Sequence, residues 1–340
     1  MAGKEKENVF LRFEGMLRMK GDPMLDVKDL RVRFDTDEGT ANVVNGVDIK
    51  LDRGDTLAIL GESGSGKSVT LRALMRLLPK RRTRISGSVK IDGEDILTAD
   101  DSRLTALRGG TVSMIFQEPR LAFDPVFKIG MQIKETIRQH ERISDRSAYQ
   151  RALEMLEHVQ IPSARSRMDN YPHEMSGGML QRAMIALALS CRPKLLLADE
   201  PTTALDATVQ IQILLLLRSL QKEFNMSVVF VTHDIGVAVE MADNLAVMYA
   251  GRFVETAPVR SILRDSKHPY SRGLMSSTIG SVDSGVRLKP IPGAPPNMTK
   301  QIDGCPFAPR CSDRFENCTL VEPRAESVDE RHRVLCHLYQ

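Results

Sequence analysis

One octapeptide constrains the fold of this chain more than any other feature. Gly61-Glu-Ser-Gly-Ser-Gly-Lys-Ser68 fits the phosphate-loop pattern G-x4-G-K-[S/T] and lies between an apolar strand predicted at 56–60 and a helix predicted at 69–78. Glycines let the backbone curl around an anion, and the following helix directs its positive end at the anion. The pattern predicts nucleotide phosphate binding, with Lys67 reaching the β- and γ-phosphates and Ser68 ligating Mg²⁺. The alternative is an ordinary glycine turn.

A second apolar run ends in two acids, Leu195-Leu-Leu-Ala-Asp199-Glu200. A carboxylate at the end of a neighbouring strand suits Mg²⁺, so we expect Asp199 to bind the metal directly or through water. Glu200 is then placed to polarise an attacking water, which would make the chain a hydrolase. The alternative is a strand that ends in solvated acids.

The remaining pattern alternates strands with helices and predicts a largely parallel α/β sheet preceded by an antiparallel layer. Strands are expected at 25–34, 47–51, 56–60, 195–198, 228–231 and 245–249. Helices are expected at 69–78, 209–224 and 237–242, and residues from about 130 to 190 are helix-rich. After about residue 258 the character changes to a proline-rich segment at 289–297 and a cysteine-bearing tail.

Composition limits the function classes. A net charge of +3 on 340 residues is too small to indicate nucleic-acid binding. No segment approaches the roughly 18 apolar residues that cross a bilayer, and charges interrupt the apolar stretch near the N-terminus, unlike a signal peptide. We therefore expect an intracellular chain without a membrane span of its own.

A third motif lies between the first two, Met175-Ser-Gly-Gly-Met-Leu-Gln-Arg182. It resembles the signature motif of ATP-binding-cassette (ABC) ATPases, and other elements of that family follow in order over about residues 25–258. Gln117 resembles the Q-loop glutamine, Asp206 in Ala204-Leu-Asp the D-loop, and His233 the switch histidine. Phe34 stands near the place of the aromatic residue that stacks on adenine.

The resemblance narrows to the oligopeptide/dipeptide importer branch. Segments 171–179 and 191–206, and in the tail 268–270, 291–296 and 305–311, are similar to that branch. The signature departs from the commonest ABC form at Met175 and Met179, although this branch often has Met at the second place. The implied fold class is α/β: a P-loop NTPase ABC cassette with a RecA-like core, an antiparallel β layer and a helical subdomain, plus a small C-terminal metal-binding extension.

The resemblance implies an N-terminal extension at 1–24, an ABC ATPase domain at 25–258 with its helical subdomain at about 120–185, and a C-terminal extension at 259–340. It implies that Glu200, His233 and Gln117 are catalytic and that Ser68, Gln117 and Asp199 hold Mg²⁺. The residues expected to contact ATP, in cis or from a partner cassette, are Phe34, Gly61, Ser63, Gly64, Ser65, Gly66, Lys67, Ser68, Val69, Asp199, Ser176, Gly177, Gly178 and Asp206.

The resemblance also implies partners. These are a second ABC ATPase subunit, homologous and non-identical, two transmembrane permease subunits and an extracytoplasmic peptide-binding protein, with no nucleic acid. The chain would work at the cytoplasmic face of a bacterial inner membrane. The alternatives are the same role for nickel or another small solute, and a soluble ABC ATPase outside transport.

Four cysteines fall in the tail, Cys305, Cys311, Cys318 and Cys336. Four thiolates suit zinc or an iron–sulfur cluster, although structural zinc sites usually use closer pairs. The resemblance implies a [4Fe–4S] cluster. Zinc binding and free thiols remain alternatives. His332 or His337 could also replace one thiolate as a metal ligand, although solvated tail histidines are the simpler interpretation. Disulfides are disfavoured in a reducing cytosol. Cys191 is expected to be a buried packing thiol.

Overall fold

The computed structural model describes residues 22–37, 39–202, 206–279, 291–300 and 302–340. Most of the predicted N-terminal extension at 1–24 lies outside the described residues. The same holds for Ala204 and Leu205 of the D-loop and for Pro290 of the proline-rich segment.

In the described part of the chain, the main sheet has eight strands in the order β11-β12-β10-β9-β3-β8-β7-β6. Its parallel part comprises β3 (Thr56–Leu60), β6 (Val112–Ile115), β7 (Leu195–Asp199), β8 (Ser227–Thr232) and β9 (Asn244–Tyr249). The strands β10 (Arg252–Pro258), β11 (Ala325–Asp329) and β12 (His332–Leu335) continue it in antiparallel fashion. Fully buried β-branched and leucine residues in β3, β7 and β8 are typical of parallel strands that are covered on both faces.

A second, antiparallel sheet has the order β2-β1-β4-β5. Its strands are β1 (Leu25–Thr36), β2 (Gly39–Leu51), β4 (Thr83–Ile91) and β5 (Glu94–Asp95). Alternate side chains such as Val27, Val47 and Val89 are buried and share one apolar core with Ile59 of the main sheet. The predicted antiparallel layer is therefore confirmed, and the two sheets pack face to face.

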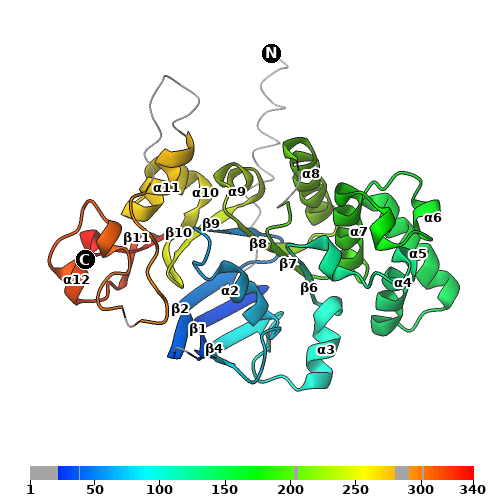
Figure 1. Ribbon diagram of the computed structural model, residues 1–340, viewed down its shortest axis with the longest axis horizontal. Helices are drawn as coiled ribbons and strands as arrows, with labels where there is room; N and C mark the ends of the chain where they lie inside the picture. Colours follow the sequence, from blue (N-terminus) through cyan, green and yellow to red (C-terminus); the bar gives the residue numbers. More distant parts are fainter. Residues whose placement is uncertain (1–21, 38, 203–205, 280–290, 301) are drawn as a thin grey trace, which may run out of the picture.

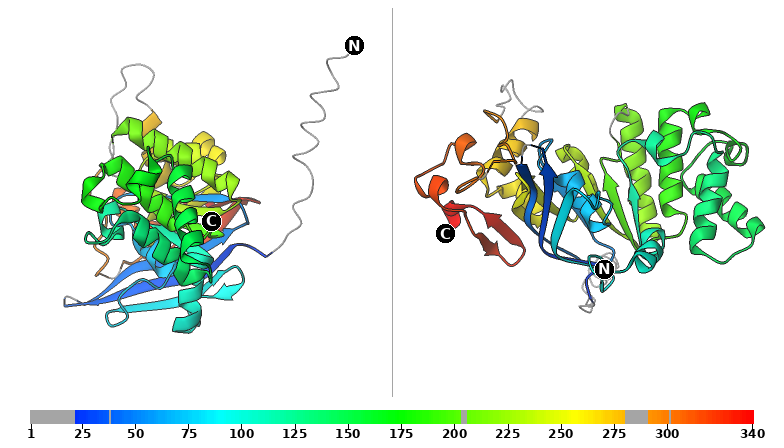
Figure 2. Two further views of the ribbon diagram at one scale, coloured as in Figure 1. Left: turned by 90° about the vertical axis from the view of Figure 1, so that its right-hand side faces the viewer. Right: turned by 60° about the horizontal axis from the view of Figure 1, so that its bottom comes forward.

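The described helices fall into three groups. Near the sheets lie α2 (Lys67–Leu74), α3 (Asp101–Gly110), α8 (Ala207–Glu223), α9 (Ile235–Met241), α10 (Val259–Asp265) and α11 (Pro269–Ile279). A helical region contains η1 (Pro119–Ala122), α4 (Ile129–His140), α5 (Asp145–His158), α6 (Ala164–Arg167), η2 (Pro172–Glu174) and α7 (Gly177–Leu189). The C-terminal part adds η3 (Ala308–Arg310), α12 (Asn317–Leu320) and η4 (His337–Tyr339). Figures 1 and 2 show the helical region and the C-terminal part at opposite ends of the molecule.

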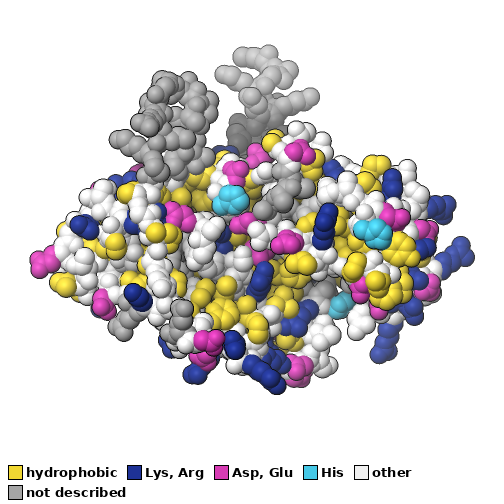
Figure 3. All heavy atoms as spheres, in the orientation of Figure 1, with side chains coloured by type: hydrophobic (Ala, Val, Ile, Leu, Met, Phe, Trp, Pro, Cys, Tyr) yellow, Lys and Arg dark blue, Asp and Glu magenta, His cyan; other side chains and the backbone are white. Residues whose placement is uncertain are grey.

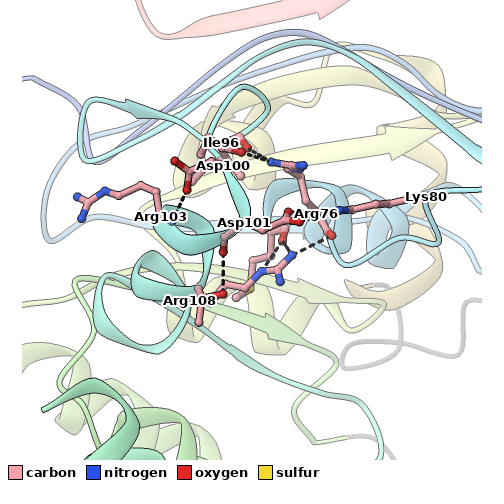
Figure 4. A network of polar contacts seen from close by, with 10 residues as sticks. Arg76, Lys80, Ile96, Asp100, Asp101, Arg103 and Arg108 are labelled. Carbon is pink, nitrogen blue, oxygen red and sulfur yellow. Dashed lines mark hydrogen bonds and ion pairs between the residues drawn. The ribbon is translucent and has the colours of Figure 1, made fainter.

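The helix predicted at 69–78 ends earlier than expected, at Leu74 of α2. Arg76 adopts a positive φ of 50°, and the Leu77 N–H donates to the Arg72 carbonyl at 2.9 Å, which closes the helix end. The guanidinium of Arg108, in the last turn of α3, donates to the carbonyls of Met75 and Arg76 at 2.7 and 2.9 Å (Figure 4). A cation at a helix C-terminus stabilises the carbonyl ends, so this contact fixes the far end of α2.

The C-terminal part packs onto the cassette, because its hairpin joins the main sheet. Glu255 of β10 pairs with Val334 of β12, and Thr256 pairs with Arg333. The solvated interpretation of His332 is wrong: its side chain is 3% exposed, and its Nε2 lies 2.7 Å from Glu255 Oε1. The buried Glu255 carboxylate also accepts from the backbone N–H groups of Lys267 and His268. Sequence reasoning missed this hairpin, since its pairing depends on a distant strand.

Two surface features bear on function. No helix in the described residues is long and apolar enough to cross a membrane. On the face drawn in Figure 3, basic and acidic side chains are interspersed and do not gather into one extended basic patch.

Candidate ATP-binding and hydrolysis site

The candidate site lies at the carboxyl edge of the parallel strands. Because β3, β6, β7 and β8 run in the same direction, the residues that follow them meet at one edge of the sheet. These residues are the phosphate loop after β3, Gln117 after β6, Glu200 after β7 and His233 after β8. The structure thus brings four predicted elements, which are scattered over more than half of the chain, to the same edge.

The phosphate loop needs its glycines for steric and conformational reasons. Gly64 and Gly66 have φ values of 79° and 104°, a region that side chains with a Cβ rarely adopt. A Cβ on Gly61 would lie 2.2 Å from the Met248 carbonyl oxygen, and one on Gly66 would lie 2.7 Å from that of Val43. At Gly61 and Gly66 the backbone of the loop packs directly against the backbone of its neighbours, with no room for a side chain.

Lys67 is the first residue of α2 and is only 5% exposed. Its Nζ donates to the Gly61 carbonyl at 2.8 Å and to the Glu62 carbonyl at 2.9 Å. Burial lowers the pKa of this ammonium group, while the nearby carboxylates of Glu200 and Asp199 oppose that shift. The cation is thus held inside the curl of the loop, where a phosphate anion would meet it together with the N-terminus of α2.

Ser68 and Asp199 meet across the strand edge. The Ser68 hydroxyl donates to Asp199 Oδ1 at 2.6 Å, and the Asp199 side chain is fully buried. Its second oxygen, Oδ2, has no hydrogen-bond partner among the described residues and lies 3.8 Å from an Arg72 nitrogen. Burial raises the pKa of Asp199, and the Ser68 hydrogen bond works against that rise. A buried carboxylate oxygen without a donor, beside a hydroxyl, fits the oxygen ligands that Mg²⁺ prefers.

Glu200, Gln117 and His233 form a second group beside Asp199. Gln117 Nε2 donates to Glu200 Oε2 at 3.1 Å, and His233 Nδ1 lies 3.5 Å from Glu200 Oε1. Glu200 has a positive φ of 46°, a strained backbone value for a residue with a side chain. The Glu200 side chain is 14% exposed whereas that of His233 is 63% exposed, so the carboxylate lies inside and the imidazole at the surface.

The signature motif begins α7 at the surface. Ser176 is the N-cap and accepts a hydrogen bond from the Met179 N–H at 3.3 Å, while Ser176 and Gly177 are exposed. A Cβ on Gly178 would lie 3.1 Å from Val209 of α8. Within the same helix, buried Gln181 donates to the Pro201 carbonyl at 2.5 Å, which ties the signature helix to the turn after Glu200.

The other predicted contact residues are placed as follows. Asp206 is exposed and caps α8 by accepting from the Val209 N–H at 3.0 Å. Phe34 is half-buried in β1, opposite Ala41 and Thr83, so it lies on the antiparallel sheet and not in the phosphate loop. Ser63 is exposed in the loop, Ser65 is buried with its Oγ lacking a hydrogen-bond partner among the described residues, and Val69 is half-buried in α2.

Sequence reasoning missed three residues that contact this site. Arg72, one helical turn after Ser68, approaches Asp199, and its spacing on α2 was a usable signal. Tyr270 and Arg310 contact Glu62 of the phosphate loop from 208 and 248 residues further along the chain. No local pattern marks those two contacts.

The four tail cysteines line one small pocket, which Phe307, His268 and His337 also line. The Cys305 N–H donates to the Cys318 carbonyl at 2.8 Å. Burial raises the pKa of Cys305 to about 11 and also raises the pKa values of Cys311 and Cys336. The described residues nevertheless contain no group of three or more His, Cys, Asp or Glu side chains arranged to hold a metal ion, so the structure does not support the predicted metal-binding extension.

Cys191 lies outside that pocket. It is half-buried, with Sγ 3.8 Å from the Thr136 carbonyl, and burial raises the pKa of its thiol. This agrees with packing, although the residue is less completely enclosed than expected.

Comparisons with known proteins agree with this geometry. Residues 44–203 match the ABC transporter family, and residues 254–318 match the family described as "Oligopeptide/dipeptide transporter, C-terminal region". A dimeric ATP-binding cassette, MJ0796, solved bound to ADP and Pi, has a TM-score of 0.63 and 29% identity and covers 70% of this chain and 99% of its own. CbiO1 of Clostridium perfringens has a TM-score of 0.62 and 25% identity; the match covers 72% of this chain and 92% of CbiO1.

Whole-chain relatives narrow the match. The oligopeptide transport ATP-binding protein OppD of Escherichia coli (strain K12) is 45% identical over 318 residues, 94% of each chain. A Brucella abortus (strain 2308) protein, provisionally named a peptide import ATP-binding protein, is 47% identical over 307 residues, 90% of this chain and 92% of its own.

The fold and the carboxyl-edge site therefore define an ABC-family P-loop ATPase, in which an ATP-hydrolysing cassette combines a mixed α/β core with an antiparallel sheet. Within that family the chain belongs to the oligopeptide/dipeptide transporter branch as an ATP-binding subunit of the OppD type. The alternatives of a nickel transporter and of a soluble non-transport ATPase are not favoured.

Proposed function

We propose that this chain hydrolyses ATP to drive peptide import through membrane subunits on other chains. The observation that carries the proposal is the grouping of Glu200 with Gln117 and His233, 3.1 and 3.5 Å away, beside the Ser68–Asp199 contact. A nucleotide-binding protein needs only the phosphate loop, whereas a hydrolase also needs a group that orients water.

In this mechanism, the phosphate loop and Lys67 bind the triphosphate through backbone N–H groups and the buried ammonium. Glu200 accepts a proton from the attacking water, or orients it, at Oε1 or Oε2. His233 and Gln117 hold that carboxylate in place. The exposed imidazole of His233 is also proposed to donate a hydrogen bond to the γ-phosphate. Phe34 stacks on adenine, and Ser63, Ser65 and Val69 contact the phosphates or their loop.

Asp199, Ser68 and Gln117 are the proposed Mg²⁺ ligands. Asp199 Oδ2 supports this assignment, because it is a buried oxygen without a hydrogen-bond donor. When bound, the metal neutralises charge on the phosphate oxygens. The Ser68–Asp199 hydrogen bond keeps the two oxygen donors together before any ligand arrives.

The signature motif is proposed to bind the ATP of a partner cassette. Ser176, Gly177 and Gly178 stand at the exposed start of α7, where helix N–H groups favour an anion. Asp206 would contact the same partner. Two nucleotides would thus join two cassettes, and loss of the γ-phosphate would let them separate. The partner is proposed to be a homologous, non-identical chain.

Contact with membrane subunits is proposed next to the Q-loop. Exposed apolar side chains gather in the segment that leads from Gln117 into the helical region: Phe116, Leu121, Val126, Phe127 and Met131. Cytoplasmic segments of two permease subunits would cover these side chains, so a movement there would reach Gln117. The chain would then lie at the cytoplasmic face of a bacterial inner membrane, served by an extracytoplasmic peptide-binding protein.

The tail cysteines are proposed to hold a [4Fe–4S] cluster. Cys305, Cys311, Cys318 and Cys336 line one pocket, and four thiolates are the ligand set of such a cluster, although in the described residues the four are not arranged to hold a metal ion. The cluster would supply soft metal–thiolate bonds that join η3, α12 and β12. Iron and sulfide in an anaerobic preparation support it; zinc, or four freely alkylated thiols, contradicts it.

The proposed function is tested by co-expression with candidate permease subunits and by measuring ATP turnover and peptide uptake in vesicles. We expect peptide-stimulated turnover that requires Mg²⁺. Turnover unaffected by Glu200→Gln would contradict the assigned chemistry, and transport of nickel without peptide would contradict the substrate class.

A further inference from the structure

Arg310, in the C-terminal part, makes a bidentate ion pair with Glu62, the second residue of the phosphate loop. Arg310 Nη1 lies 2.8 Å from Glu62 Oε2, and Nη2 lies 3.0 Å from Oε1. The two residues are 248 positions apart in the sequence, and the Arg310 side chain is only 5% exposed. Fork-to-fork pairs of this kind fix orientation as well as charge.

The surroundings hold the guanidinium in one orientation. Its Cζ lies 5.7 Å from the centre of the Tyr249 ring and 6.0 Å from that of Phe307. Its Nε donates to the Pro292 carbonyl at 2.8 Å, and Nη1 lies 3.4 Å from the Tyr249 hydroxyl. The Glu62 carboxylate raises the pKa of Arg310, so the guanidinium stays positively charged at any ordinary pH.

Glu62 is held by its other polar groups as well. Its backbone N–H donates to the hydroxyl of fully buried Tyr270 at 3.0 Å, and its carbonyl accepts from Lys67 Nζ at 2.9 Å. A continuous chain of contacts therefore runs from Arg310 through Glu62 to the lysine that is proposed to bind the phosphates. The residue it passes through belongs to the loop that would surround the triphosphate.

Charge gives this contact a second consequence. A carboxylate in a phosphate loop repels the triphosphate unless a cation neutralises it, and a partly buried charge is poorly screened. Arg310 supplies that cation from outside the cassette's own nucleotide motifs.

We propose that Arg310 is a positioning residue for nucleotide binding: it neutralises Glu62 and holds the phosphate loop and Lys67 in the geometry that accepts a triphosphate. The inference rests on the proposed function, because it assumes that ATP binds at this loop. It gives the C-terminal region a part in shaping the ATP site, through the contact of Arg310 with Glu62.

Steady-state kinetics on the full chain in its assembled complex test the proposal. Arg310→Met should raise KM for ATP about tenfold, the equivalent of one lost charge-assisted hydrogen-bond pair, while kcat changes less than about twofold. Glu62→Gln in the Arg310→Met background should bring KM back to within about threefold of the original value, because it removes the charge that Arg310 neutralised. Arg314→Met, at an exposed arginine in the same region, serves as the matched control and should leave KM unchanged.

A merely structural role for Arg310 predicts a different result, since removing the Glu62 charge would not repair a misfolded tail. Lack of rescue, or an unchanged KM in Arg310→Met, overturns the proposal. If Arg310→Met does not fold, Arg310→Lys keeps the charge without the fork: a KM raised by less than the roughly tenfold increase expected for Arg310→Met is the supporting result, and an unchanged KM contradicts the proposal. Mg²⁺–ATP binding to the isolated chain distinguishes failure of the proposed function from failure of this proposal. If the assembled complex shows no ATP turnover, the proposed function fails. The ATP affinities of the same variants as isolated chains still test the role of Arg310.

Discussion

The two faces proposed to sandwich ATP differ in how far this single chain completes them. On the phosphate side, Lys67 and Asp199 are buried and already bonded within the chain, and Arg310 closes the loop from behind. On the signature side, Ser176 and Gly177 are exposed, and the motif forms only the capped N-terminus of α7. The difference indicates that one half of the site is prepared by folding, whereas the other half presents donors for a ligand that arrives with a partner.

The largest expected effect separates binding from chemistry on the phosphate side. Glu200→Gln keeps the side-chain shape and removes the proton acceptor, so turnover should fall by about 10²–10⁴-fold. Mg²⁺–ATP binding to the isolated chain should change little, because Lys67 and Asp199 remain in place. Turnover in the assembled complex and nucleotide binding by calorimetry measure the two quantities. Glu316→Gln, at an exposed carboxylate in the tail, is the control; equal losses in both variants would contradict the assignment.

The next effect distinguishes the two faces directly. Ser176→Ala removes a donor proposed to serve the partner's nucleotide, so turnover in the complex should fall by about 10²-fold, the usual cost of one such donor. Binding of ATP to the isolated chain should stay the same, unlike in Lys67→Ala, where it should be lost. If Ser176→Ala weakens binding by the isolated chain as strongly as Lys67→Ala does, the division between the faces is wrong.

A smaller effect, on stability, is expected from the hydrogen bond that joins the signature side to the phosphate side. Gln181 of the signature helix donates to the Pro201 carbonyl next to Glu200. Gln181→Leu should lower the free energy of unfolding by about 1–3 kcal/mol, because it leaves a buried carbonyl without its donor. Urea denaturation measures this loss. Gln212→Leu, on neighbouring α8, is the matched control. Equal free energies of unfolding for the two variants would show that the Gln181–Pro201 hydrogen bond does not stabilise the fold.

The last expected effect is a pH dependence of stability, which arises behind the phosphate side. His268 is fully buried, and burial lowers its pKa to about 3 from an ordinary value of 6.5. Its Nδ1 accepts from the Tyr270 N–H, and Tyr270 contacts the phosphate loop. Because the unfolded chain binds this proton more readily, stability should be retained above pH 6.5 and should decline as the pH falls towards 3.

His268→Gln should flatten that decline in urea denaturation curves collected between about pH 4 and about pH 6, an interval that lies between the two pKa values. His158→Gln, at a partly exposed histidine on α5, is the control. A pH slope that is the same in the original chain and in His268→Gln would contradict the role of this buried imidazole.

The sequence predictions succeeded where a local sequence pattern marks the residues and failed where the outcome depends on residues far apart in the sequence. The strand at Thr56–Leu60 is confirmed at its predicted bounds, and Ser68 and Asp199 meet as expected, because apolar runs and glycine spacing are local signals. The place of Gln117 beside Glu200 was expected from the family resemblance alone. The C-terminal hairpin and the Arg310–Glu62 pair were not predicted, since each depends on a partner far along the chain. The end of α2 was missed because distant Arg108 and a left-handed Arg76 decide it.

The pairing of β12 with β10 has a consequence for shortened forms of this chain. A premature stop that removed the last strands would leave the backbone of β10 as an open, unprotected edge. Such edges recruit other chains, so a truncated product would tend to aggregate or to be degraded and would not persist as a smaller working cassette. The edge of β10 is thus protected only when a strand that lies about 75 residues further along the chain pairs with it.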